Sequence, residues 1–176
     1  MKHFFATLIL LGLVNHVLGQ NSIAMETSKT NQKATLDFTK TKIDGVRHSD
    51  FLLAFNVTEL PKIIHKMHME VAQFNLKDLK LYTPGEKASY KVLFNEGKCK
   101  IEASYNDEGE LTQSEESYEN VRIPYSVSSK LAKDYPGWAF NNTLCKITYN
   151  QSGLPKITYH ITMDKDGKKK TVKVNI

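Results

Sequence analysis

An internal repeat constrains this chain more than any other feature of its sequence. Residues 98–109 align with residues 156–167: both segments have twelve residues, begin with Lys and end with an acidic residue followed by Gly. Upstream, residues 91–98 align with residues 146–156 when the turn in the second copy is allowed to be longer. A repeat of this length predicts one supersecondary unit that occurs twice.

Each copy is predicted to begin with a helix. A hydrophobic residue followed by proline, Leu60-Pro61 in the first copy and Ile123-Pro124 in the second, opens the helix. Proline suits the first helical turn because its missing N–H has no partner there in any case. Apolar residues then recur every three or four positions, the spacing of one buried helical face. These residues are Ile63, Ile64, Met67, Val71 and Phe74 in the first copy, and Val127, Leu131 and Tyr135 in the second.

Three strands are predicted after each helix. Apolar and polar residues alternate in runs that are separated by turns of the type Asn/Asp-x-Gly, which is a hairpin pattern. Hairpins pair antiparallel, and the helices need an apolar face to cover. We therefore expect an α+β fold: an antiparallel sheet of about six strands with two helices on one face, built from two helix-β-β-β repeats.

The N-terminal segment predicts export. Residues 1–19 have a basic start, an apolar run of eleven residues (4–14) and a small residue, Gly19, before the expected cleavage point. Eleven apolar residues are too few for a membrane-spanning helix, which needs about 20, so we expect a periplasmic or secreted protein without a membrane span after cleavage. Residues 20–57 are expected to be a polar leader followed by an ambiguous segment, in which Leu36, Phe38 and Ile43 suggest a further strand.

The domain at 58–176, with repeat one at 58–121 and repeat two at 122–176, resembles the PepSY-like family of exported bacterial proteins. The residues that carry the resemblance are the two hydrophobic-Pro helix starts and the helix end Lys133-Asp-Tyr-Pro-Gly-Trp138. The strand pattern Tyr90-Lys-Val-Leu-Phe94, followed by Tyr105-Asn-Asp-Glu-Gly-Glu-Leu111, also belongs to it. The family's fold is related to β-lactamase inhibitory proteins, so the resemblance implies a non-enzymatic, inhibitor-like binding module.

Catalytic, metal and nucleic-acid functions find little support in the residues. The formal net charge of +5 is too small an excess to indicate nucleic-acid binding. His65 and His68 are three residues apart on the first helix, which is expected to place them side by side on its surface. No third ligand follows at a metal-binding spacing. The acidic turns before Gly109 and Gly167 are typical of hairpins, and no activated nucleophile motif occurs. We expect no catalytic residue, no metal site and no cofactor.

Two cysteines and a set of aromatic residues are the remaining candidates. Cys99 and Cys145 could form one disulfide, or pack as free thiols. Half of the strand aromatics must fill the core, and the rest would lie on the uncovered face of the sheet, where they suit partner binding. The binding-face candidates are Tyr90, Tyr105, Tyr118, Tyr149, Tyr159 and Trp138.

These patterns favour a monomeric, non-catalytic binding module that contacts an exported or cell-envelope protein through the open sheet face. The alternative is a carrier or sensor of a small ligand in the cleft between the repeats. The sequence does not name the partner or the ligand.

Overall fold

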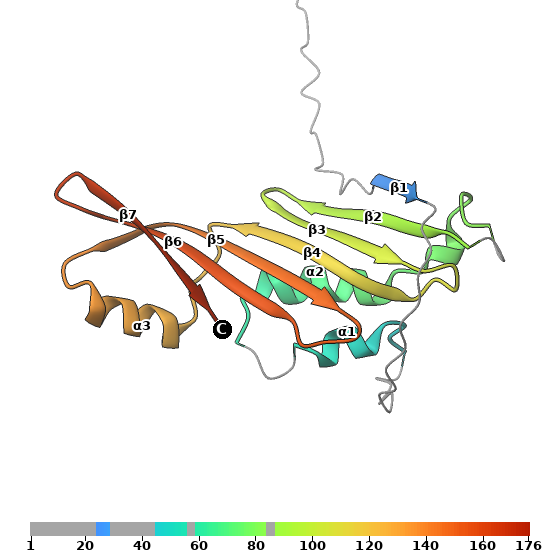
Figure 1. Cartoon of the computed structure of the whole chain (residues 1–176), viewed down its shortest axis with the longest axis horizontal. Coiled ribbons are helices and arrows are strands. Elements are labelled where there is room, and N and C mark those ends of the chain that lie inside the picture. Colours follow the sequence, from blue (N-terminus) through green and yellow to red (C-terminus); the bar gives the residue numbers. More distant parts are fainter. Residues whose placement is uncertain (1–23, 29–44, 56–58, 84–86) are drawn as a thin grey trace, which may run out of the picture.

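The computed structural model of the chain describes residues 24–28, 45–55, 59–83 and 87–176 (Figure 1). Its centre is a single antiparallel sheet in which every strand pairs with the next strand along the chain. The strands are β1 (Ala24–Ser28), β2 (Ser89–Glu96), β3 (Cys99–Tyr105), β4 (Leu111–Glu119), β5 (Ala139–Asn150), β6 (Lys156–Lys165) and β7 (Lys168–Asn175). The prediction of an α+β fold with an antiparallel sheet is confirmed.

The helices lie on one side of this sheet (Figure 1). They are α1 (Ser49–Leu53), α2 (Lys62–Gln73), the short 3-10 helix η1 (Leu76–Asp78) and α3 (Tyr125–Asp134). Pro61 and Pro124 are the residues that directly precede α2 and α3, as the hydrophobic-Pro pattern predicts. Beyond α3, Gly137 has a φ of 80°, which glycine adopts without steric cost, and this turn leads the chain into β5.

The core lies between the helices and the covered face of the sheet. Alternate strand residues point toward the helices, and one row of paired positions crosses five strands: Cys99, Tyr118, Cys145, Tyr159 and Val174. The first four of these are buried, and Val174 packs against the core. Ile64, Met67 and Val71 of α2 are fully buried on the opposite side of this core.

Both halves of the domain run in the order helix and then three strands. Gly109 lies in the turn from β3 to β4 and Gly167 in the turn from β6 to β7, with φ values of 80° and 75°. Residues 98–109 and 156–167 therefore adopt the same element types. That the halves are two copies of one unit stays an interpretation of this shared order.

The segment before the domain contributes more structure than the sequence patterns predict. Ala24–Ser28, inside the expected polar leader, forms β1 and pairs with β2. Helix α1, in the ambiguous segment, places Phe51 in the core, and Phe55 follows just after it. The predicted signal peptide and the possible strand at Leu36, Phe38 and Ile43 lie outside the described residues.

Candidate binding surface

The strand tyrosines do not lie on the open face of the sheet. Each of them points toward the helices and is at most 5% exposed: Tyr90, Tyr105, Tyr118, Tyr149 and Tyr159. They share the covered face with the apolar strand residues because all occupy positions of the same alternation. Trp138 is half-buried against the same core. The expectation that the strand tyrosines form an exposed binding face is therefore wrong.

The covered face instead contains a buried polar network. His68 Nε2 of α2 lies 2.7 Å from Glu116 Oε2 of β4, and these side chains are 1% and 0% exposed. Glu116 also accepts hydrogen bonds from Ser114 Oγ at 2.7 Å and from Tyr118 OH at 2.6 Å. The rings of Phe51 and Phe55 pack on the His68 imidazole, with centroids 4.9 and 4.4 Å away. The three side chains that contact Glu116 thus have this carboxylate as their hydrogen-bond partner. The pocket around them is otherwise aromatic.

This network ties α2 to the middle of the sheet rather than offering a reactive site. Solvent does not reach His68 or Glu116, so neither can meet a substrate in this structure. The expected position of His68 on the helix surface is wrong: of the two histidines of α2, His65 is exposed and His68 is buried. Within the part of the chain that the structure describes, no cluster of three His, Cys, Asp or Glu could hold a metal ion.

The two cysteines are free and buried. Both lie opposite Tyr118, Cys99 from β3 and Cys145 from β5, so β4 separates them. Two strand spacings place their Cα atoms roughly 10 Å apart, whereas a disulfide needs about 7 Å or less. Of the two alternatives that the sequence left open, the structure therefore shows free, packed thiols and not a disulfide. Burial raises the pKa of the Cys145 thiol to about 12.

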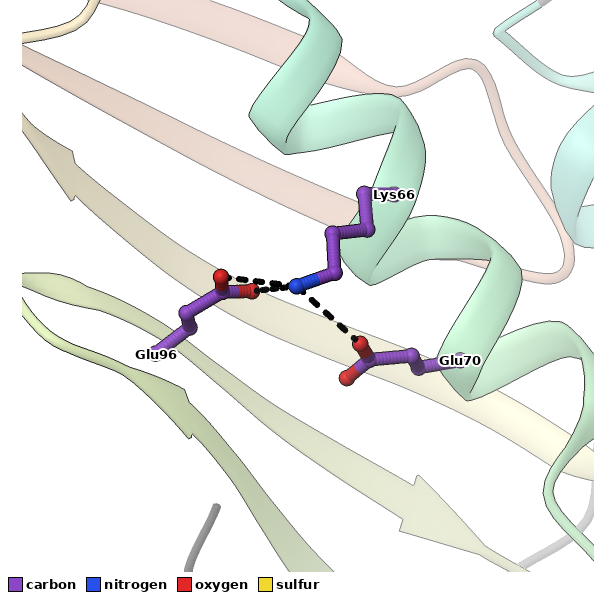
Figure 2. Close-up of polar contacts among 3 residues, drawn as sticks. All are labelled: Lys66, Glu70 and Glu96. Atoms are coloured by element: carbon purple, nitrogen blue, oxygen red, sulfur yellow. Dashed lines mark hydrogen bonds and ion pairs between the residues drawn. The ribbon is translucent and has the colours of Figure 1, made fainter. Parts of the chain in front are cut away.

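Several charged residues of the N-terminal half are joined in ion pairs. On the open face, Lys91 Nζ lies 2.7 Å from Glu102 Oε1, and Lys98 Nζ lies 3.5 Å from Glu119 Oε2. On the helix side, Lys66 of α2 reaches both carboxylate oxygens of Glu96 at 2.7 Å, and Glu70 at 4.0 Å (Figure 2). This hydrogen bond to Glu96 raises the pKa of Lys66.

The open face of the C-terminal half carries lysines without such partners. Lys146 lies opposite Thr158, Lys156 opposite Thr148, and Lys173 opposite His160. All three lysines are exposed. None makes an ion pair within 4.0 Å with a described residue. We call this surface the lysine face: Lys146, Lys156 and Lys173, with Thr158 and His160 between them.

The charge of residues 45–176 is divided in the same way, and residues 1–44 add a net charge of +2. Residues 45–121 contain nine Lys or Arg and thirteen Asp or Glu, a net charge of −4. Residues 122–176 contain ten Lys or Arg and three Asp, a net charge of +7. The modest overall charge of +5 therefore conceals an acidic half and a basic half.

A polar groove of about 520 Å³ lies at the C-terminal end of α2. It is formed where the residues before α1, the end of α2, the turn from β3 to β4 and Gln151 come together. Arg47, Lys77, Asp50, Glu108 and Glu110 give its lining charges of both signs. His48 also lines it; its Nε2 lies 3.2 Å from the Phe74 carbonyl oxygen, and burial lowers the pKa of this imidazole.

Comparison with known protein families, curated proteins and solved structures finds no match to this chain. The resemblance to the PepSY-like family thus stays an interpretation of the quoted motifs. Among the helices of the described residues, none is both long and apolar enough to cross a membrane.

Proposed function

We propose that this chain is an exported, non-catalytic binding module that captures an acidic protein partner through the lysine face. One observation carries the proposal: Lys146, Lys156 and Lys173 are exposed on the same face, and none of them makes an ion pair within 4.0 Å with a described carboxylate. Serine, threonine and histidine lie directly opposite the three lysines, so no directly paired carboxylate offsets their positive charge. Such a cluster is therefore useful when an oppositely charged partner covers it.

The N-terminal half provides the internal comparison. There, two lysines of the open face are paired with glutamates, Lys91 with Glu102 and Lys98 with Glu119, whereas Lys100 is exposed without an ion pair to a described residue. A surface that only needs to stay soluble can use such a balanced arrangement. An unbalanced basic face raises the association rate with an acidic partner and orients that partner during the encounter. An inhibitor-like role, in which capture covers the partner's own site, is one form of this binding.

Anisotropy titration with fluorescein-labelled poly-L-glutamate tests the proposal. We expect the triple variant Lys146→Glu, Lys156→Glu and Lys173→Glu to lose binding, and we expect the wild-type affinity to fall as salt increases because exposed charges are screened. The matched control reverses three exposed lysines of the N-terminal half, Lys62, Lys80 and Lys87, and so changes the net charge equally. Equal loss in both variants would contradict the lysine face as the binding site.

The groove supports a second candidate function, the capture of a small ligand. Its volume of about 520 Å³ is within the range of small-molecule sites. Arg47 and Asp50 place both signs of charge on its lining, which suits a zwitterion. Native mass spectrometry of the protein purified under mild conditions tests this candidate. A stoichiometric small molecule that is lost from Arg47→Ala supports it, and a bare protein mass counts against it.

A further inference from the structure

The two edges of the sheet differ in the strand that forms them and in its side chains. At one edge, β1 pairs with β2 over five residue pairs, from Ala24 with Leu93 to Ser28 with Ser89. At the other edge, β7 pairs with β6, and no described strand lies along its outer side. An edge strand presents a row of unpaired backbone N–H and C=O groups, which can template the addition of another strand.

The side chains of β7 differ between its two faces. Val172 and Val174 are partly buried and pack against the core on the helix side. Lys169, Thr171 and Lys173 lie opposite Asp164, Thr162 and His160, so they belong to the open face. Lys173 is itself part of the lysine face, and that face therefore continues to the free edge.

This alternation defines the segment that the edge can accept. A strand beside β7 would place one set of side chains next to Val172 and Val174 and the other set next to Lys169 and Lys173, because successive residues point to opposite faces. Apolar residues suit the first set and carboxylates the second. A second copy of β7 would bring lysine against lysine, and like charges directly opposite each other destabilise such a pair.

We propose that β7 accepts an extended segment of the partner as an added strand, and that this segment alternates acidic with apolar residues. The inference rests on the proposed function and specifies how the acidic partner is held. Backbone hydrogen bonds along β7 provide the affinity, and alternate side chains provide the selectivity, as in other cases of strand addition.

Three labelled octapeptides and the unmodified protein test this proposal. The first peptide alternates Glu with Val or Thr, the second has the same composition with all Glu residues in one block, and the third replaces one central Val of the first with Pro. Anisotropy gives the affinities, and amide hydrogen exchange of β7 reports pairing. We expect the first peptide to bind and to protect β7 amides. The Pro peptide should bind about tenfold more weakly or worse, since proline removes a backbone donor and disrupts an added strand.

Each other outcome overturns strand addition at β7 and shows which assumption is wrong. Equal affinity for all three peptides, without protection of β7, means that charge alone drives binding, in which case the proposed function stands. Failure of all three peptides overturns strand addition, and the poly-L-glutamate titration then decides whether the proposed function fails as well. Protection of β7 that rises with protein concentration in the absence of peptide shows that a second copy occupies the edge.

Discussion

The two halves of the domain differ in their recorded ion pairs: within the described residues these all lie in the N-terminal half, and the lysine face of the C-terminal half has none. In the first half, α2 is joined to the sheet by the buried His68–Glu116 pair and by the exposed contact of Lys66 with Glu96. In the second half, the Nζ groups of Lys165 and Lys170 contact the Pro136 carbonyl and the Tyr135 ring, while the lysine face has no carboxylate partners among the described residues. The same order of helix and strands thus supports a structural half and a proposed binding half.

The largest expected effect concerns Glu116, at the centre of the structural half. Glu116→Ala removes the acceptor for Ser114, Tyr118 and His68 and leaves buried polar groups without partners, so it should lower the free energy of unfolding by about 3–5 kcal/mol. Chemical denaturation measures this loss. The adjacent Glu115 is exposed on the open face, and Glu115→Ala should change the value by less than about 0.5 kcal/mol. Similar losses in both variants would refute the structural role of the network.

A pair of tyrosines compares the two halves directly. Tyr118 OH donates to Glu116, so Tyr118→Phe should cost about 1.5–3 kcal/mol, the range for hydrogen bonds to charged groups. The Tyr159 hydroxyl is buried and has no nitrogen or oxygen hydrogen-bond partner among the described residues. Its neighbour across the strands is the thiol of Cys145, a weak acceptor. Tyr159→Phe should therefore leave the stability unchanged or raise it slightly. A larger loss for Tyr159→Phe than for Tyr118→Phe would reverse the comparison.

Alkaline pH should reveal the buried Cys145 thiol of the C-terminal half. Burial raises the pKa of Cys145 from 9.0 to about 12. Below pH 9 the Cys145 thiol is protonated in both the folded and the unfolded chain, so its burial contributes its full stability. As the pH rises from 9 toward 12, the unfolded chain releases the thiol proton and the folded chain keeps it, so this contribution to the free energy of unfolding is lost. The free energy of unfolding should fall by about 1.4 kcal/mol per pH unit in this window from Cys145 alone.

Cys145→Ala provides the control, since its unfolding free energy should fall less steeply between pH 9 and 10 than that of the wild type. The buried tyrosines, whose pKa values burial also raises, steepen the loss above pH 10 in both proteins. Identical slopes below pH 10 would show that Cys145 ionises as readily in the folded protein as in the unfolded chain.

Local patterns in the sequence predicted the elements well. Proline before each helix and alternation in each strand are properties of neighbouring residues, and α2, α3 and β2–β7 follow from them. The positions of Cys99 and Cys145 depend instead on the register of β4 between them, which no local pattern determines. The sequence alone could not pair His68 with Glu116, which is 48 residues away.

One signal for the buried site was nevertheless present. Ser114, Glu116 and Tyr118 share one side of β4 by simple alternation, so a buried Tyr118 implies a buried Glu116 that needs a partner. The tyrosines were predicted on the open face because their aromatic rings suit binding. However, their alternation with the apolar strand residues places them in the core, where the helices cover them.

Amide NMR of the ¹⁵N-labelled protein during titration with poly-L-glutamate tests the division between the halves most directly. If the C-terminal half is the binding half, shift changes should concentrate in β5, β6 and β7, around Lys146, Lys156 and Lys173, and should disappear at high salt. The amides of β2 and β3 should stay unperturbed. Changes centred on the groove residues near His48, or spread equally over both halves of the sheet, would contradict the account.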